Sequence, residues 1–216
     1  MTKTNSDKQS TYQNGVPPLL REQSSKPIQI GIAVNGLVKA LPLHDLAPEE
    51  FERLCLRLIE REVDVEAHAT LYGRSGQKQH GIDIYTQRHD TREHWVYQCK
   101  RYEEYDSSKL NKSVGLFVCN WQVAQGQEPA FVGLPPKKKP SKTVSEETES
   151  KEYTPPKWFA EIKRFVICIT TDFGNDTDLG NAERDLSKLL EDLGLKLEVW
   201  HADVINGKIK FFDHFG

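Results

Sequence analysis

Apolar residues recur at helical spacing in three parts of the chain, and each pattern predicts a helix with one buried face. The first begins at Pro48, a residue that suits the first turn of a helix, and its apolar face comprises Phe51, Leu54, Cys55, Leu58 and Ile59. The second begins near Asp106, and its apolar stripe comprises Leu110, Val114, Phe117, Val118 and Trp121. The third ends before Gly194, and its apolar positions are Leu179, Ala182, Leu186, Leu189, Leu190 and Leu193.

Apolar runs between and after these helices predict strands. Two strands flank a polar turn around residues 89–91: one carries Asp83 within an apolar segment, and the other runs through residues 95–100. Residues 165–170 form an apolar run suited to a strand covered on both faces, and residues 195–200 alternate as a further strand. The order strand, helix, strand predicts a parallel crossover. We therefore expect an α/β fold with a mixed β-sheet flanked by helices.

Composition divides the chain of 216 residues into regions of different character. Residues 1–26 are polar and are expected to form a disordered or loosely attached tail. Residues 27–42 contain Asn35-Gly36 between apolar positions, a two-residue turn that predicts a small β-hairpin. Residues 43–216 are expected to form one domain. It is interrupted by the Pro-, Lys- and Glu-rich stretch 126–157, which cannot build a core and is predicted to be a flexible insertion.

Three polar side chains on the hairpin around residues 89–91 point to chemistry. Side chains alternate along a strand, so Gln98 and Lys100 project from the same face, and Asp83 on the paired strand can reach that face too. An acid, an amide and a lysine that converge at a strand edge suit a divalent metal ion and a scissile phosphate. The alternative is an ordinary amphipathic hairpin, with Lys100 and Arg101 as solvated edge charges.

Glu52 projects at the edge of the apolar face of the first predicted helix. A carboxylate in that position is desolvated at some cost unless a metal ion or a lysine compensates it. Glu52 is therefore a further candidate for the same site. The alternative is a boundary residue that bends out to water.

Asp83, followed by an apolar-Gln-x-Lys segment, resembles the PD-(D/E)xK nuclease superfamily, and more narrowly its Mrr-type restriction endonuclease branch. The segments GIDIY, YQCKRY and PEEFERLCLRLIE carry the resemblance, which covers residues 43–110 and, more weakly, residues 158–210. It implies a restriction-endonuclease-like fold with a catalytic acid on the helix that contains Glu52. Gln98 departs from the wider superfamily, in which an acid is commoner at this position. Fewer carboxylates remain for a metal, so more weight falls on Asp83 and Glu52.

Under this resemblance the expected reaction is metal-dependent hydrolysis of a phosphodiester. Asp83, Glu52 and the backbone carbonyl of Cys99 would bind Mg²⁺ or Mn²⁺, which prefer oxygen ligands. Gln98 would serve as an amide ligand or would orient water. Lys100 would position the attacking water and stabilise charge on the phosphate.

The expected substrate is double-stranded DNA, and the contacts to it must be local because the net charge of the chain is −3. The glycine-rich segment before Asp83 supplies Arg74, Lys78 and His80, and Arg101 follows the strand that carries Lys100. This segment could equally be a plain polar loop. His80 could assist proton transfer, contact a phosphate or be incidental.

The expected role is that of a restriction or anti-phage defence endonuclease, acting as an effector module with a sensor domain C-terminal to this chain. Two alternatives remain: a catalytically inactive nuclease-like module that binds nucleic acid, and a structure-selective nuclease for junctions or repair intermediates. The presence of an acid, Gln-x-Lys and a helix Glu argues against the inactive module. A homodimer or larger oligomer would cut both strands, with the hairpin at residues 27–42 as a candidate interface.

The four cysteines are scattered through apolar segments, at Cys55, Cys99, Cys119 and Cys168. No C-x-x-C motif or His/Cys cluster in the sequence indicates zinc, so they are predicted to be reduced core residues of a cytoplasmic protein. No apolar run approaches the roughly 20 residues needed to span a bilayer, so no membrane association is expected.

Overall fold

The computed structural model of the chain describes residues 40–62, 69–73, 80–88, 91–129, 155–174 and 176–213. The expected tail, almost all of the expected hairpin at 27–42 and residues 130–154 of the expected insertion lie outside the described residues. None of the helices in the described ranges is long and apolar enough to cross a membrane.

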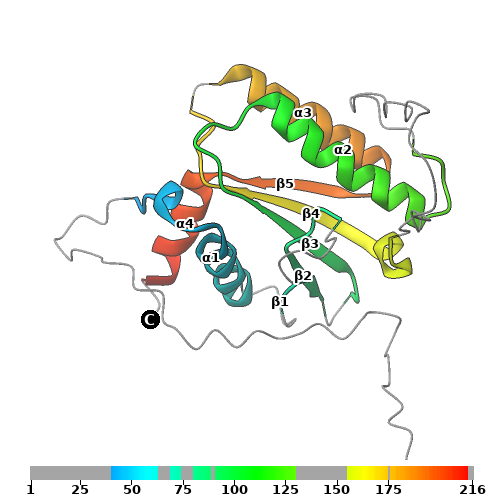
Figure 1. Cartoon of the computed structure of the whole chain (residues 1–216), viewed down its shortest axis with the longest axis horizontal. Helices are drawn as coiled ribbons and strands as arrows, with labels where there is room; N and C mark the ends of the chain where they lie inside the picture. The colour runs from blue at the N-terminus through cyan, green and yellow to red at the C-terminus, as the bar shows by residue number, and fades with distance from the viewer. Residues whose placement is uncertain are drawn as a thin grey trace, which may run out of the picture.

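A five-stranded mixed sheet forms the centre of the described structure, and its strands lie side by side in chain order (Figure 1). The strands are β1 (Thr70–Leu71), β2 (Ile84–Gln87), β3 (His94–Lys100), β4 (Ile162–Ile169) and β5 (Lys196–Trp200). β1 pairs with β2, and β2 with β3, in antiparallel fashion, while β3, β4 and β5 are parallel. The hairpin predicted around residues 89–91 is confirmed by the β2–β3 pair. The predicted parallel crossover is confirmed by the parallel strands β4 and β5, which α3 connects.

Helices cover both faces of the sheet, which gives a three-layer α/β fold (Figure 1). α1 (Pro48–Arg61) and α4 (Ala202–Asp213) lie on one face, and α2 (Ser107–Ala124) and α3 (Thr177–Asp192) lie on the other. The parallel strand β4 is therefore covered on both sides, as the apolar run at residues 165–170 predicts. The expected mixed sheet flanked by helices is confirmed.

α1 forms where the apolar spacing predicts it. Pro48 occupies the first turn, and the Glu50 carboxylate accepts a hydrogen bond from the N–H of Ala47 (2.9 Å), which pairs an otherwise exposed donor at the helix start. The predicted apolar residues are all buried, namely Phe51, Leu54, Cys55, Leu58 and Ile59. Glu52 lies at the edge of this face and is half-buried.

Alternate residues of β3 contribute to two hydrophobic cores, one on each side of the sheet. Val96 belongs to the core under α2 and α3, where the rings of Phe117 and Phe165 stack with 4.0 Å between their centroids. Tyr97 and Cys99 belong to the core under α1 and α4. A position on β3 therefore decides which helical layer its side chain meets.

β1 and α4 were not predicted from the sequence. β1 spans only Thr70–Leu71, too short to show an alternating pattern. α4 contains Asn206 and Gly207, residues of low helix propensity. Tertiary interactions outweigh this propensity, because Ile205 is fully buried and the side chain of Asn206 accepts a hydrogen bond from the N–H of Leu41 (2.7 Å).

α3 follows its predicted span with one difference in the buried face. Its buried residues are Leu179, Leu186 and Leu190. Leu189 was expected in the same apolar stripe, but it is 41% exposed, because α3 packs through a narrower strip than the sequence suggested. Gly194 adopts a left-handed conformation (φ 74°) just after the helix, which ends it as predicted.

Replacing Asp176 with Ala should lower the free energy of unfolding by about 1 kcal/mol. Its Oδ1 accepts hydrogen bonds from the N–H groups of Asp178 (2.9 Å) and Leu179 (3.0 Å), at the first turn of α3. Urea denaturation of both proteins measures the change. Asp176→Asn keeps an acceptor oxygen and should retain most of the stability, whereas equal losses in both variants would contradict a capping role.

Candidate active site

Asp83 lies where the β2–β3 ladder ends. It directly precedes β2, one position outside the strand in which the sequence pattern placed it. Its N–H donates to the Tyr97 carbonyl (2.8 Å), and its own carbonyl accepts from the Tyr72 N–H (2.7 Å). Its carboxylate Oδ2 accepts the N–H of Cys99 (2.7 Å), a donor that would otherwise bond to a backbone carbonyl of the neighbouring strand. The carboxylate is therefore held against the end of β3 that carries Lys100.

Asp83 and Lys100 are both close enough to Glu52 to influence its pKa. The pKa of Glu52 is raised to about 7, mainly by burial and next by the charge of Asp83, while the ammonium group of Lys100 acts to lower it. Burial also raises the pKa of Asp83, against the opposing effects of the Cys99 N–H and Lys100. The fold thus brings together a carboxylate from α1, a carboxylate beside β2 and a lysine at the end of β3.

Gln98 is almost fully buried, at 2% exposure, on the face of the sheet that α2 covers. A β-carbon built at Gly81 would lie 2.9 Å from its Nε2 and 3.8 Å from Leu116 on α2, so the amide packs between the segment before Asp83 and that helix. Its Oε1 has no hydrogen-bond partner in the part of the chain that the structure describes. Leaving such an oxygen unpaired costs about 1–3 kcal/mol, so a bound cation or water molecule would satisfy it.

The carbonyl of Cys99 is directed to the same side as Asp83. In an extended strand the N–H and C=O of one residue point to the same neighbour. The N–H of Cys99 faces Asp83, whereas the carbonyl of Lys100 faces β4 and accepts from the Thr170 N–H (3.3 Å). Carboxylate and carbonyl oxygens are therefore available at the end of the β2–β3 ladder, and this donor set fits a hard divalent cation such as Mg²⁺ or Mn²⁺.

Replacing Gly81 with Ala should destabilise the protein by about 1–3 kcal/mol and impair the site. Gly81 has a φ of +78°, which disfavours a side chain, and the added carbon would displace the Gln98 amide. Gly207→Ala, in the open helical environment of α4, makes the same change with nothing within 4 Å of the new carbon. Thermal or urea denaturation of both variants measures the effect, and Gly207→Ala should leave the stability unchanged or raise it. Equal stability of the two variants would show that Gly81 is not constrained.

The structure describes only some of the residues that were expected to contact DNA. Arg74 and Lys78 lie outside the described residues. His80 is half-buried, its ring edge-on to Phe159 with 5.9 Å between centroids, and its carbonyl accepts from the Asn120 side chain (3.3 Å). His80 is thus packed beside α2.

Arg101 is exposed, and its Nε donates to the carbonyl of His44 (3.1 Å). It borders a surface pocket that also involves His44, Tyr102, Glu103, Glu104 and Lys109. The ammonium group of Lys109 lies 5.3 Å from the centre of the Tyr102 ring. The pocket joins segments that are far apart in the chain, so spacing in the sequence could not reveal it.

Comparison with protein families matches residues 43–128 to the family Mrr_cat, described as a restriction endonuclease. The matched segment contains α1, the β2–β3 hairpin and α2, and hence Glu52, Asp83 and Lys100. The resemblance to Mrr-type restriction endonucleases is confirmed, and with it the restriction-endonuclease-like character of the α/β fold. The match supports the interpretation of this domain as a nuclease. No curated protein and no solved structure matches the chain.

Proposed function

We propose that this chain is a DNA endonuclease that depends on a divalent metal ion, with Glu52, Asp83, Gln98 and Lys100 in its active site. The observation that carries the proposal is the fixed Asp83 carboxylate at the end of the β2–β3 ladder, beside Glu52 and Lys100. These residues come from a segment that matches a restriction endonuclease family. An ordinary amphipathic hairpin would not require two repelling carboxylates to be held near one lysine.

The residues that would hold the metal are Asp83 and Glu52, together with the amide oxygen of Gln98 and the carbonyl of Cys99. When bound there, Mg²⁺ or Mn²⁺ would lower the pKa of a water molecule and polarise the phosphoryl group. One oxygen of Asp83 accepts the Cys99 N–H, so the other oxygen would take the metal.

The side chains themselves account for the remaining steps of hydrolysis. The Lys100 ammonium group would neutralise charge that develops on the phosphate and would orient the attacking water. Glu52, with a pKa raised to about 7, can hold or release a proton near neutral pH. The Gln98 amide would fix the orientation of a water molecule or of the substrate.

Phosphate contacts would come from the surface around this site. Arg101 and Lys109 border the pocket next to the end of β3. Arg74, Lys78 and His80, which precede Asp83 in the chain, remain proposed contacts. A patch of this size agrees with the net charge of −3, which does not favour a DNA-coating surface. We propose a restriction or anti-phage defence role, in which a homodimer or larger oligomer cuts both strands and a sensor domain controls the effector.

Incubation of the purified protein with supercoiled plasmid and Mg²⁺ or Mn²⁺ tests the proposal. Nicked or linear DNA that forms only with the metal, and not with a chelator, is expected. Folded protein that binds duplex DNA without cutting it under either metal would favour the inactive binding module. Preference for branched over linear duplexes would favour the structure-selective nuclease.

A further inference from the structure

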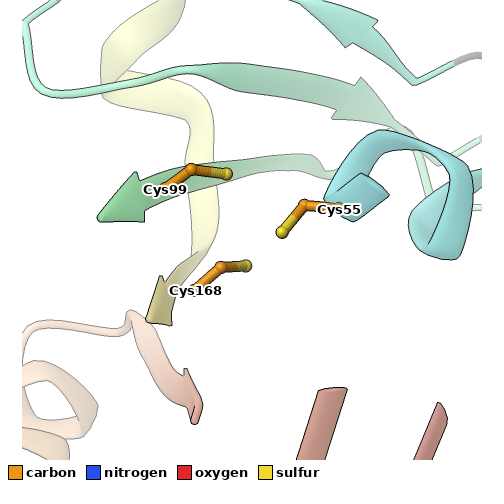
Figure 2. Close-up of side chains that lie close together, drawn as sticks. All are labelled: Cys55, Cys99 and Cys168. Atoms are coloured by element: carbon orange, nitrogen blue, oxygen red, sulfur yellow. The ribbon is translucent and has the colours of Figure 1, made fainter. Parts of the chain in front are cut away.

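Three of the four cysteines converge at one point in the core (Figure 2). Cys55 comes from α1, Cys99 from β3 and Cys168 from β4, and all three are buried free thiols. Cys99 and Cys168 are register partners on neighbouring parallel strands, and α1 packs over them. Their Sγ atoms lie within 4.8 Å of one another. The fourth cysteine, Cys119, lies apart on α2 and is only half-buried.

The spacing of the sulfur atoms suits a shared metal ion. A thiolate–metal bond of about 2.3 Å places the sulfurs of a three-coordinate site about 4 Å apart, so the thiols need to move by less than roughly 1 Å. Thiolates select soft ions such as Cu⁺ and Zn²⁺, whereas Mg²⁺ and Mn²⁺ take oxygen ligands. A sulfur cluster would therefore not compete with the oxygen donors around Asp83 for the same ion.

We infer that Cys55, Cys99 and Cys168 form a binding site for one soft metal ion of the Cu⁺ or Zn²⁺ class, separate from the oxygen-donor site. The observation that carries the inference is the convergence of thiols from three elements, each able to hydrogen bond to the other two. Apolar packing alone does not require sulfur at all three positions, since other small apolar side chains bury comparably well.

The location of this cluster would link the ion to the candidate active site. Cys55 lies one helical turn from Glu52 on α1, and the N–H of Cys99 binds the carboxylate of Asp83. An ion held by all three thiols would tie α1 to β3 and β4, the elements that position both carboxylates and Lys100. Binding to the folded state alone would also stabilise the protein.

Titration of the reduced, chelator-treated full chain with Zn²⁺, and separately with Cu⁺ in the absence of oxygen, tests the inference. One ion per chain is expected by metal analysis, with a rise in melting temperature. Under conditions in which the buried thiols of the metal-free protein react, the bound ion should slow the alkylation of these three thiols and leave that of Cys119 unchanged. The Zn²⁺ and Cu⁺ titrations together show which of the two ions the site binds. Stoichiometric binding of either ion supports the inference.

Variants connect the binding to the cluster. Cys55→Ala and Cys168→Ala should lose stoichiometric binding, and Cys119→Ala, the matched control on α2, should retain it. Asp83→Asn should lose Mg²⁺ binding and keep the soft ion, which separates this inference from the proposed nuclease function. The inference would be overturned by any of three results. The wild type could bind neither ion, binding could persist without Cys55, or two of the three thiols could form a disulfide in the untreated protein. If a variant fails to fold, the slowing of alkylation that the ion causes in the wild type, relative to the metal-free protein, decides between the two outcomes.

Discussion

Asp83→Asn should reduce plasmid cleavage at least about 10³-fold while the protein stays folded. The substitution removes the charge that a divalent cation requires, but it keeps an oxygen that can accept the N–H of Cys99, so the end of the β2–β3 ladder should be preserved. Loss of a buried carboxylate whose pKa is raised by burial should not lower stability. Cleavage rates at saturating Mg²⁺, with circular dichroism as the check on folding, measure the effect.

Two companion proteins sharpen this experiment. Asp185→Asn makes the same change at an exposed position of α3, in the opposite layer from α1, and should cut at the wild-type rate. Lys100→Met should also lose cleavage yet still bind Mg²⁺, because Lys100 is assigned to water and phosphate and Asp83 to the metal. Wild-type cleavage by Asp83→Asn or by Lys100→Met would refute the assignment of that residue.

Local patterns in the sequence were sufficient to nominate most residues of the proposed oxygen-donor site. Asp83, Gln98 and Lys100 belong to one hairpin, so alternation along its strands places them near each other without knowledge of the rest of the fold. Glu52 was proposed because helical periodicity leaves it at the edge of an apolar face, where a carboxylate is costly. The deep burial of Gln98 was not foreseen, because it depends on α2 packing over Gly81 and β3.

Features made by packing between distant segments could not be predicted in this way. Cys55, Cys99 and Cys168 each sit in an apolar segment that reads as ordinary core, and only the packing of α1 over β3 and β4 brings the sulfurs together. α4 was missed for a similar reason, since its local propensity is poor and its contacts with the core decide its conformation. Candidate site residues that lie on one local element can be predicted from the sequence. Clusters that form only when distant elements pack against the sheet cannot.

Glu52→Gln should stabilise the metal-free protein at pH 8 and abolish tight Mg²⁺ binding. The pKa of Glu52 is raised from 4.5 to about 7, so the folded state holds the proton more tightly than the unfolded state. Stability from this group is present below the unfolded pKa and is lost as pH rises through about 7. The neutral amide avoids that loss, and we expect a gain of about 1–2 kcal/mol at pH 8 after allowance for solvent screening, with little change near pH 4.

Urea denaturation of the two proteins at pH 4 and pH 8, without metal, measures this difference. The same ionisation predicts that the Mg²⁺ affinity and the cleavage rate of the wild type fall as pH decreases through about 7, because the cation must displace the proton from Glu52. Glu60→Gln, on the same helix, is the matched control: Glu60 pairs with Arg57 at the surface (2.9 Å), so its loss should leave the Mg²⁺ affinity unchanged and alter stability by less than about 1 kcal/mol. A loss of stability in Glu52→Gln at pH 8 would mean that attraction to Lys100 outweighs the burial of the carboxylate. The pH dependence of metal binding would then have to come from Asp83, whose pKa burial also raises.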